Sequence, residues 1–305
     1  MTEYILETNA LTKHYRKFSA LNGLTMHIPK GSIYGFVGRN GAGKTTLIRL
    51  ICGLQEPSGG EYTLCGVKKT DKKIISCRRK MGAVVESPAI YSEMTAEENL
   101  KQQSHILRTS GVENISELLE LVGLGDTGKK KVKNFSLGMR QRLGIAIALA
   151  GNPQFLVLDE PINGLDPQGI IEIRELILRL NRERGITVLI SSHILDELSR
   201  LATHYGFIDG GKMIKEMSAE ELELHCRKCI CIEVNDTKPL PEVLDGMNAE
   251  YEILDGTRAN IYSDVQVTKL VTGLLERNCI VNSMKEHDEN LESFYMNLVG
   301  GERDE

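Results

Sequence analysis

The spacing of hydrophobic and polar positions changes along the chain. In the first third, short apolar runs alternate with turn residues and predict strands at residues 6–11, 23–28, 32–37 and 61–65. From about residue 89 to residue 150 the spacing becomes helical. Thr95, with Glu98 three residues later, forms a capping box that predicts the start of a helix. The region 90–150 is therefore expected to be a helical subdomain.

Continuous apolar runs mark the centre of the chain. They occupy residues 155–158 and 186–190, with a predicted helix at 170–184 between them. Runs of this kind are typical of parallel strands covered on both faces. We therefore predict an α/β core for the first two thirds of the chain.

The last ninety or so residues predict a second, smaller α+β domain. Ser218 and Glu221 form another capping box. The predicted elements that follow are a strand (230–234), a helix (240–247), a hairpin (251–254 and 258–262), a helix (265–277), a strand (280–284) and a helix (290–298). The β-α-β-β-α-β order is that of a ferredoxin-like unit. We expect two domains, 1–216 and 217–305.

Composition narrows the class of protein. The 305 residues are 41% hydrophobic and carry a net charge of −5, so we expect a folded protein without nucleic acid as a partner. The longest apolar stretch, 143–150, is far shorter than the roughly 20 residues that cross a bilayer. With no signal-like N-terminus we expect a cytoplasmic location. Cys226, Cys229 and Cys231 would suit a metal, but they fall in or beside an apolar run that predicts a strand.

A glycine-rich loop carries the strongest chemical signal. It follows the predicted strand at 33–37, opens a predicted helix at 45–52, and consists of Gly38, Arg39, Asn40, Gly41, Ala42, Gly43, Lys44, Thr45 and Thr46. The glycines let backbone N–H groups approach a phosphate, and the helix N-terminus adds partial positive charge. We expect Lys44 to neutralise β- and γ-phosphate oxygens and Thr45 to offer its hydroxyl to Mg²⁺. The loop predicts a nucleoside triphosphate site.

Two carboxylates emerge from the apolar run at 155–158. They are Asp159 and Glu160, and they stand where open α/β sheets bind ligands. We expect Asp159 to hold Mg²⁺ and Glu160 to polarise the attacking water. An apolar strand followed by Asp-Glu is a weak signal alone and a strong one beside the phosphate loop.

Residues 135–142, FSLGMRQR, narrow the family. Ser136 is a natural N-cap, and 137–150 a natural helix. Taken alone this would be an ordinary capped helix. Lying between the phosphate loop and Asp159, it resembles the signature of ABC-type ATPases, usually Leu-Ser-Gly-Gly-Gln. Because the chain already has its own phosphate loop, the resemblance implies that Ser136, Gly138 and Met139 contact ATP held by a partner subunit.

Three further residues fit the same resemblance. Asp166, in Gly164-Leu165-Asp166, matches the family's D-loop at the dimer seam. His193 follows the run at 186–190, where the family's switch histidine contacts the γ-phosphate. Tyr15 lies 23 residues before Gly38, close to where the family stacks an aromatic ring on adenine. Tyr15 would otherwise belong to a hairpin core.

Glu86 departs from the common family pattern. It follows a predicted strand at 81–85, where the family usually has Gln. Glu at this place, the length of the tail and the signature together resemble ATP-binding subunits of bacitracin and lantibiotic resistance exporters. We expect Glu86 to reach the Mg²⁺ shell or the attacking water, the alternative being a surface carboxylate.

The resemblance covers residues 3–215 and implies a phosphate-loop NTPase fold. It implies ATP and Mg²⁺ as cofactors, with Lys44, Glu160 and His193 catalytic. It also implies pairing with a second copy or a homologous subunit, and docking on an integral membrane permease at the inner face of the membrane. One alternative is an importer subunit. Another is an ABC ATPase acting on DNA or the ribosome, although the sequence shows no coiled coil, zinc module or second cassette.

Overall fold

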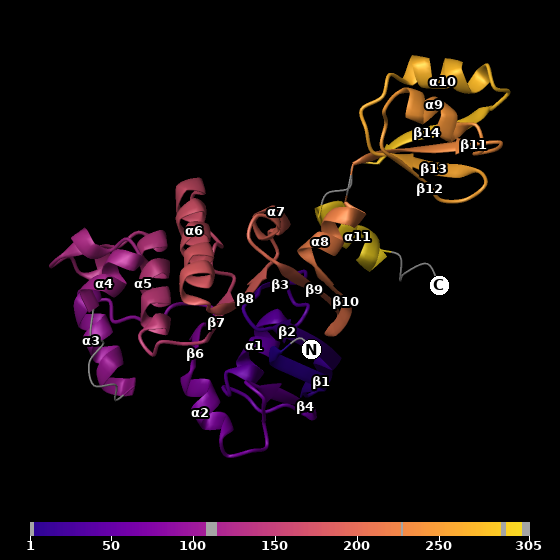
Figure 1. Cartoon of the computed structure of the whole chain (residues 1–305). Helices are drawn as coiled ribbons and strands as arrows, with labels where there is room; N and C mark the ends of the chain where they lie inside the picture. Colours follow the sequence, from indigo (N-terminus) through magenta and orange to yellow (C-terminus); the bar gives the residue numbers. More distant parts are fainter. Residues whose placement is uncertain (1–2, 108–114, 227, 288–290, 301–305) are drawn as a thin grey trace. The chain divides into compact units, whose positions relative to one another are not determined.

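The computed structural model describes residues 3–107, 115–226, 228–287 and 291–300 (Figure 1). The chain divides into two compact units, Met1–Ala219 and Glu220–Glu305. This division falls three residues after the predicted boundary at 216. That the second unit folds independently stays a prediction. Within the described ranges no helix is long and apolar enough to cross a membrane.

The first unit contains an antiparallel sheet at its N-terminal end. Its strand order is β2-β1-β4-β5, with bounds β1 (Tyr4–Tyr15), β2 (Phe18–Pro29), β4 (Gly59–Leu64) and β5 (Val67–Lys68). β1 and β2 extend beyond the predicted runs because register shifts between them allow the pairing to continue. The side chains that alternate inward, such as Leu6, Leu24 and Met26, join the core beneath the phosphate loop.

The central sheet positions the chemistry. Its order is β10-β9-β3-β8-β7-β6, with bounds β3 (Ile33–Val37), β6 (Met81–Val84), β7 (Phe155–Asp159), β8 (Thr187–Ser192), β9 (His204–Asp209) and β10 (Lys212–Ser218). All neighbours are parallel except the edge strand β10, which pairs antiparallel with β9. Every residue of β3, β7 and β8 is buried, as the continuous apolar runs predict. Loops leaving the carboxyl ends of the parallel strands therefore meet at one edge.

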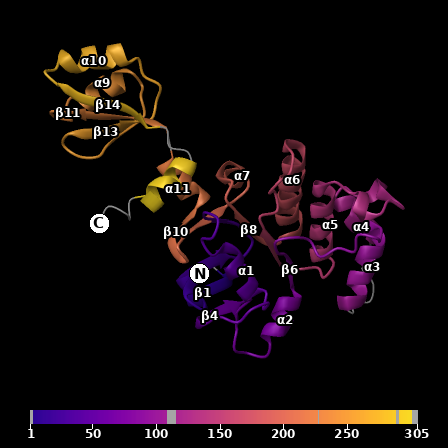
Figure 2. The ribbon, with the colours of Figure 1, turned by 180° about the vertical axis from the view of Figure 1, so that it is seen from behind.

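Helices cover the central sheet and build the helical subdomain. Their bounds are α1 (Lys44–Ile51), α2 (Ile74–Arg79), α3 (Ala96–Leu107), α4 (Ile115–Leu121), α5 (Leu137–Leu149), α6 (Pro167–Arg184) and α7 (Leu195–Ser199), with short 3-10 turns at Gly125–Thr127 and Val132–Asn134. Seen from both sides, α3, α4 and α5 gather next to α6 (Figures 1 and 2). The capping box is confirmed: Thr95 N–H donates to Glu98 Oε2 at 2.7 Å, and Glu98 N–H donates to Thr95 Oγ1 at 3.2 Å. Residues 108–114 of the predicted subdomain lie outside the described ranges.

The sequence misplaces the start of α6 and misses a hairpin. α6 begins at Pro167, three residues before the predicted start, because Asp166 Oδ1 accepts the Gly169 N–H at 3.1 Å and proline is well suited to the first helical position. The missed hairpin is β9–β10, turned at Gly210 and Gly211, whose φ values are positive. A Gly-Gly pair between apolar runs is a recognisable turn signal.

The second unit has the predicted β-α-β-β-α-β order. Its elements are α8 (Ala219–His225), β11 (Cys229–Val234), α9 (Leu240–Gly246), β12 (Tyr251–Ile253), β13 (Arg258–Ile261), α10 (Val267–Leu275), β14 (Val281–His287) and α11 (Leu291–Gly300). The sheet order is β12-β13-β11-β14 with antiparallel neighbours throughout. Residue 290, the predicted start of the last helix, lies outside the described ranges.

Apolar packing accounts for most of the interior of this unit. Ile232, Ile261, Leu244 and Leu270 form a core between the sheet and the helices α9 and α10. Cys229 and Cys231 lie in β11, as the strand interpretation predicts. Among the described residues no group of three His, Cys, Asp or Glu side chains could hold a metal ion.

Candidate nucleotide site

The loop between β3 and α1 requires glycine at defined places. Gly41 and Gly43 have φ values of 83° and 112°. A Cβ on Gly43 would lie 2.5 Å from the Ala20 carbonyl oxygen, and one on Gly38 would lie 2.7 Å from the Ile208 carbonyl oxygen. Gly43 is also the N-cap of α1, so its lack of a side chain leaves the first N–H groups of the helix accessible to a ligand. The loop and helix start together can bind phosphate oxygens.

Lys44 points back over this loop. Its side chain is only 5% exposed, and Nζ donates to the Gly38 carbonyl oxygen at 2.6 Å. Nζ also lies 3.2 Å from Glu160 Oε1. A buried ammonium group is stable only with such partners. Its position over the loop is where a phosphate group would bring further negative oxygens.

Asp159 lies at the end of β7 and is held from both sides. Thr45 Oγ1 donates to Asp159 Oδ2 at 2.8 Å, and Ser191 Oγ donates to Oδ1 at 2.6 Å. Asp159 and Ser191 are opposite each other in the β7–β8 pairing, so the sheet itself sets this contact. Adjacent hydroxyl and carboxylate oxygens are ligands that Mg²⁺ prefers. Thr45 and Asp159 therefore fit the metal that the phosphate loop predicts.

Glu160 adopts a strained backbone conformation directly after β7. Its φ is 49°, a region that costs a long side chain roughly 1–3 kcal/mol. The Ser191 hydroxyl accepts the Glu160 N–H at 3.0 Å and helps to hold the turn. His193 Nδ1 lies 2.7 Å from Glu160 Oε2, and Lys44 occupies the other carboxylate oxygen. The structure thus brings together Lys44, Glu160 and His193 from three separate segments that follow β3, β7 and β8.

A cavity of about 270 Å³ lies against the phosphate loop. The residues that line it are Phe18, Ala20, Arg39, Asn40, Gly41, Gly43, Lys44, Thr45, Thr46, Glu160 and Asn163. Phe18, Ala20 and Asn163 are not among the site residues predicted from the sequence. Phe18 is 60% exposed, which is unusual for a phenylalanine. In the sequence, the signal for its role in the site is its place in the first hairpin, two residues before Ala20. The lining residues combine the predicted phosphate ligands with an exposed aromatic ring.

Tyr15 lies in the same β1–β2 hairpin as Phe18, but it is not among the described residues that line the cavity. Its hydroxyl donates to Gln55 Oε1, and Lys13 Nζ lies 5.3 Å from the centre of its ring. Tyr15 is 37% exposed, so it is not part of a hairpin core. Its stacking on adenine stays a prediction.

The signature segment forms the predicted capped helix. Ser136 is the N-cap of α5 and accepts the Met139 N–H at 3.2 Å. Ser136, Gly138 and Met139 are not among the described residues that line the phosphate-loop cavity. Asp166 caps α6 in the same way, and a Cβ on Gly164 would lie 3.3 Å from Leu137 Cδ2. The beginnings of α5 and α6 are therefore in contact, and their caps belong to a surface separate from the phosphate loop.

Glu86 is the second strained carboxylate at this edge of the sheet. Its φ is 60°, two residues after β6 ends. Its carboxylate forms an ion pair with Arg49 in the last turn of α1, and its side chain is 58% exposed. Glu86 thus pairs with the helix that carries Lys44 and Thr45 at its start, rather than with Thr45 or Asp159 themselves. Its entry into a Mg²⁺ shell stays a prediction.

Two groups near the loop are held in their neutral forms. Burial raises the pKa of the Cys52 thiol, at the end of α1, to about 12, which excludes it as a nucleophile at neutral pH. Burial and the neighbouring Glu216 carboxylate raise the pKa of Tyr34 well above its usual value. Tyr34 therefore stays protonated and donates to Glu216 Oε1 at 2.6 Å, which anchors β3 beneath the phosphate loop.

Comparison with known proteins gives a consistent family. A family model described as ABC transporter matches residues 21–163. The bacitracin transport ATP-binding protein BcrA of Enterococcus faecalis is 37% identical over 98% of this chain and 97% of its own length. The lantibiotic transport ATP-binding protein SrtF of Streptococcus pyogenes is 44% identical over 70% of this chain and 90% of its own length.

A solved structure agrees with these relatives. It is the dimeric ATP-binding cassette MJ0796 bound to ADP and Pi, which is 26% identical, covers 70% of this chain and 98% of the cassette, and superposes with a TM-score of 0.63. Subunits of this kind bind nucleotide, hydrolyse ATP, form dimers and work with membrane permeases. The phosphate-loop geometry and these similarities together show that the chain belongs to the family of ATP-binding subunits of ABC transporters.

Proposed function

We propose that this subunit powers the export of a peptide antibiotic through a separate membrane permease. The observation that carries the proposal is the similarity, along nearly the whole chain, to a bacitracin transport ATP-binding protein. The lantibiotic transport relative supports the same substrate class over the ATPase unit. Glu86 in place of the more common Gln, together with the length of the tail and the signature at 135–139, also supports this narrower class. A second copy of this chain, or a homologous subunit, completes the ATP sites.

Each residue of the site has a separate task in this proposal. Lys44 and the loop N–H groups bind the β- and γ-phosphates of ATP. Thr45 and Asp159 would hold Mg²⁺, which neutralises charge on the phosphate oxygens. Glu160 accepts a hydrogen bond from the attacking water and takes its proton. His193 lies 2.7 Å from Glu160 Oε2 and orients that carboxylate toward the γ-phosphate.

The second half of each site comes from the partner. Ser136 and the first N–H groups of α5 form an anion site that lies outside the chain's own phosphate-loop cavity. Two copies arranged head to tail place this site against the partner's γ-phosphate. ATP bound between the two copies then holds them together. Hydrolysis releases the γ-phosphate that both copies contact, and the copies separate. The segment from Glu86 toward α3 transmits the movement to the permease at the inner face of the membrane.

Resistance of growing cells tests the proposal. The chain is expressed with a candidate permease from the same genome in a host sensitive to bacitracin and lantibiotics, and growth inhibition is measured. We expect higher tolerance to one of these peptides, and no such gain with Glu160→Gln. Unchanged tolerance, or equal tolerance with Glu160→Gln, would contradict ATP-driven export. Uptake of a solute by the same pair would favour the importer alternative.

A further inference from the structure

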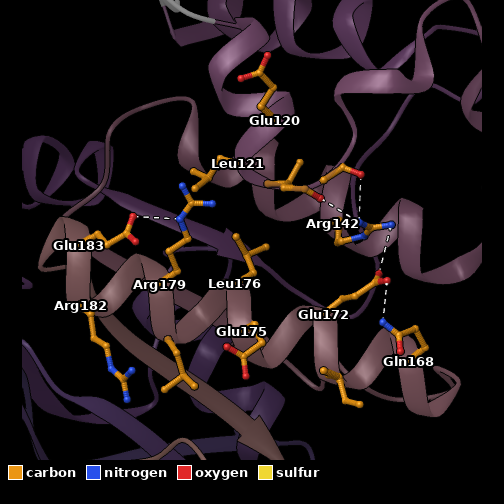
Figure 3. Close-up of a pocket in the computed structure, with 14 residues that line it drawn as sticks. Glu120, Leu121, Arg142, Gln168, Glu172, Glu175, Leu176, Arg179, Arg182 and Glu183 are labelled. Atoms are coloured by element: carbon orange, nitrogen blue, oxygen red, sulfur yellow. Dashed lines mark hydrogen bonds and ion pairs between the residues drawn. The ribbon is translucent and has the colours of Figure 1, made fainter.

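A cavity of about 780 Å³ lies between the helical subdomain and α6 (Figure 3). The end of α4, the middle of α5 and most of α6 contribute to its walls. Arg142 projects from α5 across one end of this space, where dashed lines join it to the turn after α4 and to Glu172 on α6 (Figure 3). Its guanidinium group contacts two other segments of the first unit.

The contacts of Arg142 tie these segments together. Nη1 donates to the carbonyl oxygens of Val122 and Gly123 at 3.2 and 3.1 Å. Nη2 lies 3.4 Å from Glu172 Oε2, and the Arg142 side chain is 17% exposed. Only arginine presents several donors in a fixed plane, so a lysine cannot reproduce this set of contacts.

The surroundings of Arg142 are built for this geometry. Gly123 has a φ of 66°, and a Cβ there would lie 2.6 Å from Arg142 Nη1. Glycine is therefore required both for the turn and for the approach of the guanidinium. Gln168, in the first turn of α6, donates to Glu172 Oε1 at 3.4 Å. In the described part of the chain, Arg142 Nε is buried without a hydrogen-bond partner, a cost of about 1–3 kcal/mol.

Arg142 and Glu172 occupy equivalent places on their helices. Arg142 is six residues after the N-cap Ser136, and Glu172 is six residues after the N-cap Asp166. The helices also touch at their beginnings, where Leu137 meets Gly164. Arg142 lies five residues beyond Leu137, about 7.5 Å along α5, so a contact there adds a second constraint on the relative direction of the two helices. The ion pair supplies that second contact.

We propose that Arg142 is a positioning residue for ATP hydrolysis. It holds α5 at a fixed angle to α6, so that Ser136 and Asp166 are presented together to the ATP of the partner subunit. The inference rests on the proposed two-copy site, because only there do both helix beginnings meet one nucleotide. Arg142 touches neither the phosphate loop nor the attacking water in this arrangement. Its loss should therefore lower the rate of hydrolysis and leave ATP binding by Lys44 and its loop unchanged.

The experiment compares two ion pairs that line the same cavity. Arg142→Lys and Glu172→Gln weaken the bridge between helices. Arg179→Lys and Glu183→Gln are the matched controls, because Arg179 Nε and Glu183 Oε2 lie 3.0 Å apart on one exposed face of α6. ATP affinity, kcat and melting temperature are measured on the full chain. We expect kcat to fall roughly 10- to 100-fold in the first two variants, as for other small displacements of a catalytic group, with the affinity unchanged.

Each result decides the proposal. Equal kcat in all four variants would overturn it. A loss of ATP affinity and melting temperature in parallel with kcat would also overturn it, since that pattern shows general damage to the fold. Ser136→Ala is measured alongside to separate the two levels of inference. If Ser136→Ala hydrolyses ATP normally, the two-copy site itself is wrong, whereas a slow Ser136→Ala with normal Arg142→Lys rejects the positioning role alone.

Discussion

The carboxyl edge of the central sheet and the core of the C-terminal sheet differ in what they bury. At the central edge the interior contains charged and polar groups, with Lys44 only 5% and Asp159 only 2% exposed. The C-terminal core consists of aliphatic side chains such as Ile232, Leu244 and Leu270. Buried charge costs free energy unless it is paired, whereas aliphatic burial stabilises by about 25 cal/mol per Å². The central edge therefore gives up stability that the C-terminal core retains.

Backbone strain shows the same difference. Glu86 and Glu160 have φ values of 60° and 49°, and they lie within two residues of the ends of the parallel strands β6 and β7. In the described part of the second unit, the non-glycine residues with positive φ are Asn248 and Asn278. These two lie in the turns that follow α9 and α10, a place where asparagine adopts this conformation at little cost. Ala10, Arg16 and Cys65 of the first unit also have positive φ, so strain accompanies the chemistry at this edge but is not confined to it.

Glu160→Gln should lower the rate of ATP hydrolysis more than any other change. A small effect would contradict the assignment of the chemistry to the central edge. Gln keeps the shape but cannot take a proton from water, so we expect kcat to fall roughly 10²- to 10⁴-fold. ATP binding should persist, and the variant should accumulate as a dimer in size-exclusion chromatography with ATP. Glu233→Gln, at an exposed position of β11, is the control from the second unit and should hydrolyse normally. Near-normal phosphate release by Glu160→Gln would exclude it as the base.

Thr45→Ala should produce the next largest effect. The variant loses the hydroxyl that lies 2.8 Å from Asp159 Oδ2, and with it one oxygen offered to Mg²⁺. We expect hydrolysis to fall roughly tenfold, equivalent to about 1.4 kcal/mol, and to need more Mg²⁺ for half-maximal rate. Thr45→Ser keeps the hydroxyl and should recover most of the rate. An identical Mg²⁺ titration for Thr45→Ala and the parent protein would contradict the assignment.

Glu86→Gln should have a smaller effect on the ATPase than on transport. The ion pair with Arg49 holds Glu86 beside α1, so its removal changes the coupling segment more than the phosphate site. Gln can donate as well as accept hydrogen bonds and carries no charge. We expect basal hydrolysis within about tenfold of the parent, about 1.4 kcal/mol of barrier, and a larger loss of transport. Glu61→Gln, from a surface pair with Lys68, is the control.

A result in which Glu86→Ala leaves both hydrolysis and transport unchanged would make Glu86 a surface carboxylate. Backbone strain at Glu86 would then mark a turn rather than a functional residue, and Glu160 would be the strained carboxylate with a catalytic role.

Local patterns let the sequence predict much of this site. The loop of glycines between strand and helix, the cap at Ser136 and the capping box at Thr95 each depend on residues a few positions apart. The strands β3, β7 and β8 can be predicted because each contains a continuous run of buried, mostly apolar residues. These features depend on backbone geometry that neighbouring residues determine.

Contacts between distant segments could not be predicted in the same way. The sequence gives no sign that Arg49 pairs with Glu86, or that Arg142 pairs with Glu172, since long side chains find partners only once helices are packed. Phe18 lines the phosphate-loop cavity because a hairpin folds over the loop, which local spacing does not reveal. The order β3-β8-β7 places His193 beside Glu160, and strand order is a property of the whole sheet.

Removing the second unit should have the smallest effect on nucleotide binding. The residues of the phosphate-loop cavity all belong to Met1–Ala219, so a fragment ending at residue 219 should bind ATP within about twofold of the full chain, about 0.4 kcal/mol. The exact end matters because Glu216 accepts hydrogen bonds from the Tyr34 hydroxyl at 2.6 Å and the His27 N–H at 2.8 Å. Introducing Glu216→Ala into the fragment leaves the buried Tyr34 hydroxyl without this acceptor. The free energy of unfolding of the fragment should fall by about 1–3 kcal/mol. Titration calorimetry with ATP and thermal unfolding measure the two effects, and loss of ATP binding by a folded 1–219 fragment would show that the second unit contributes to the site.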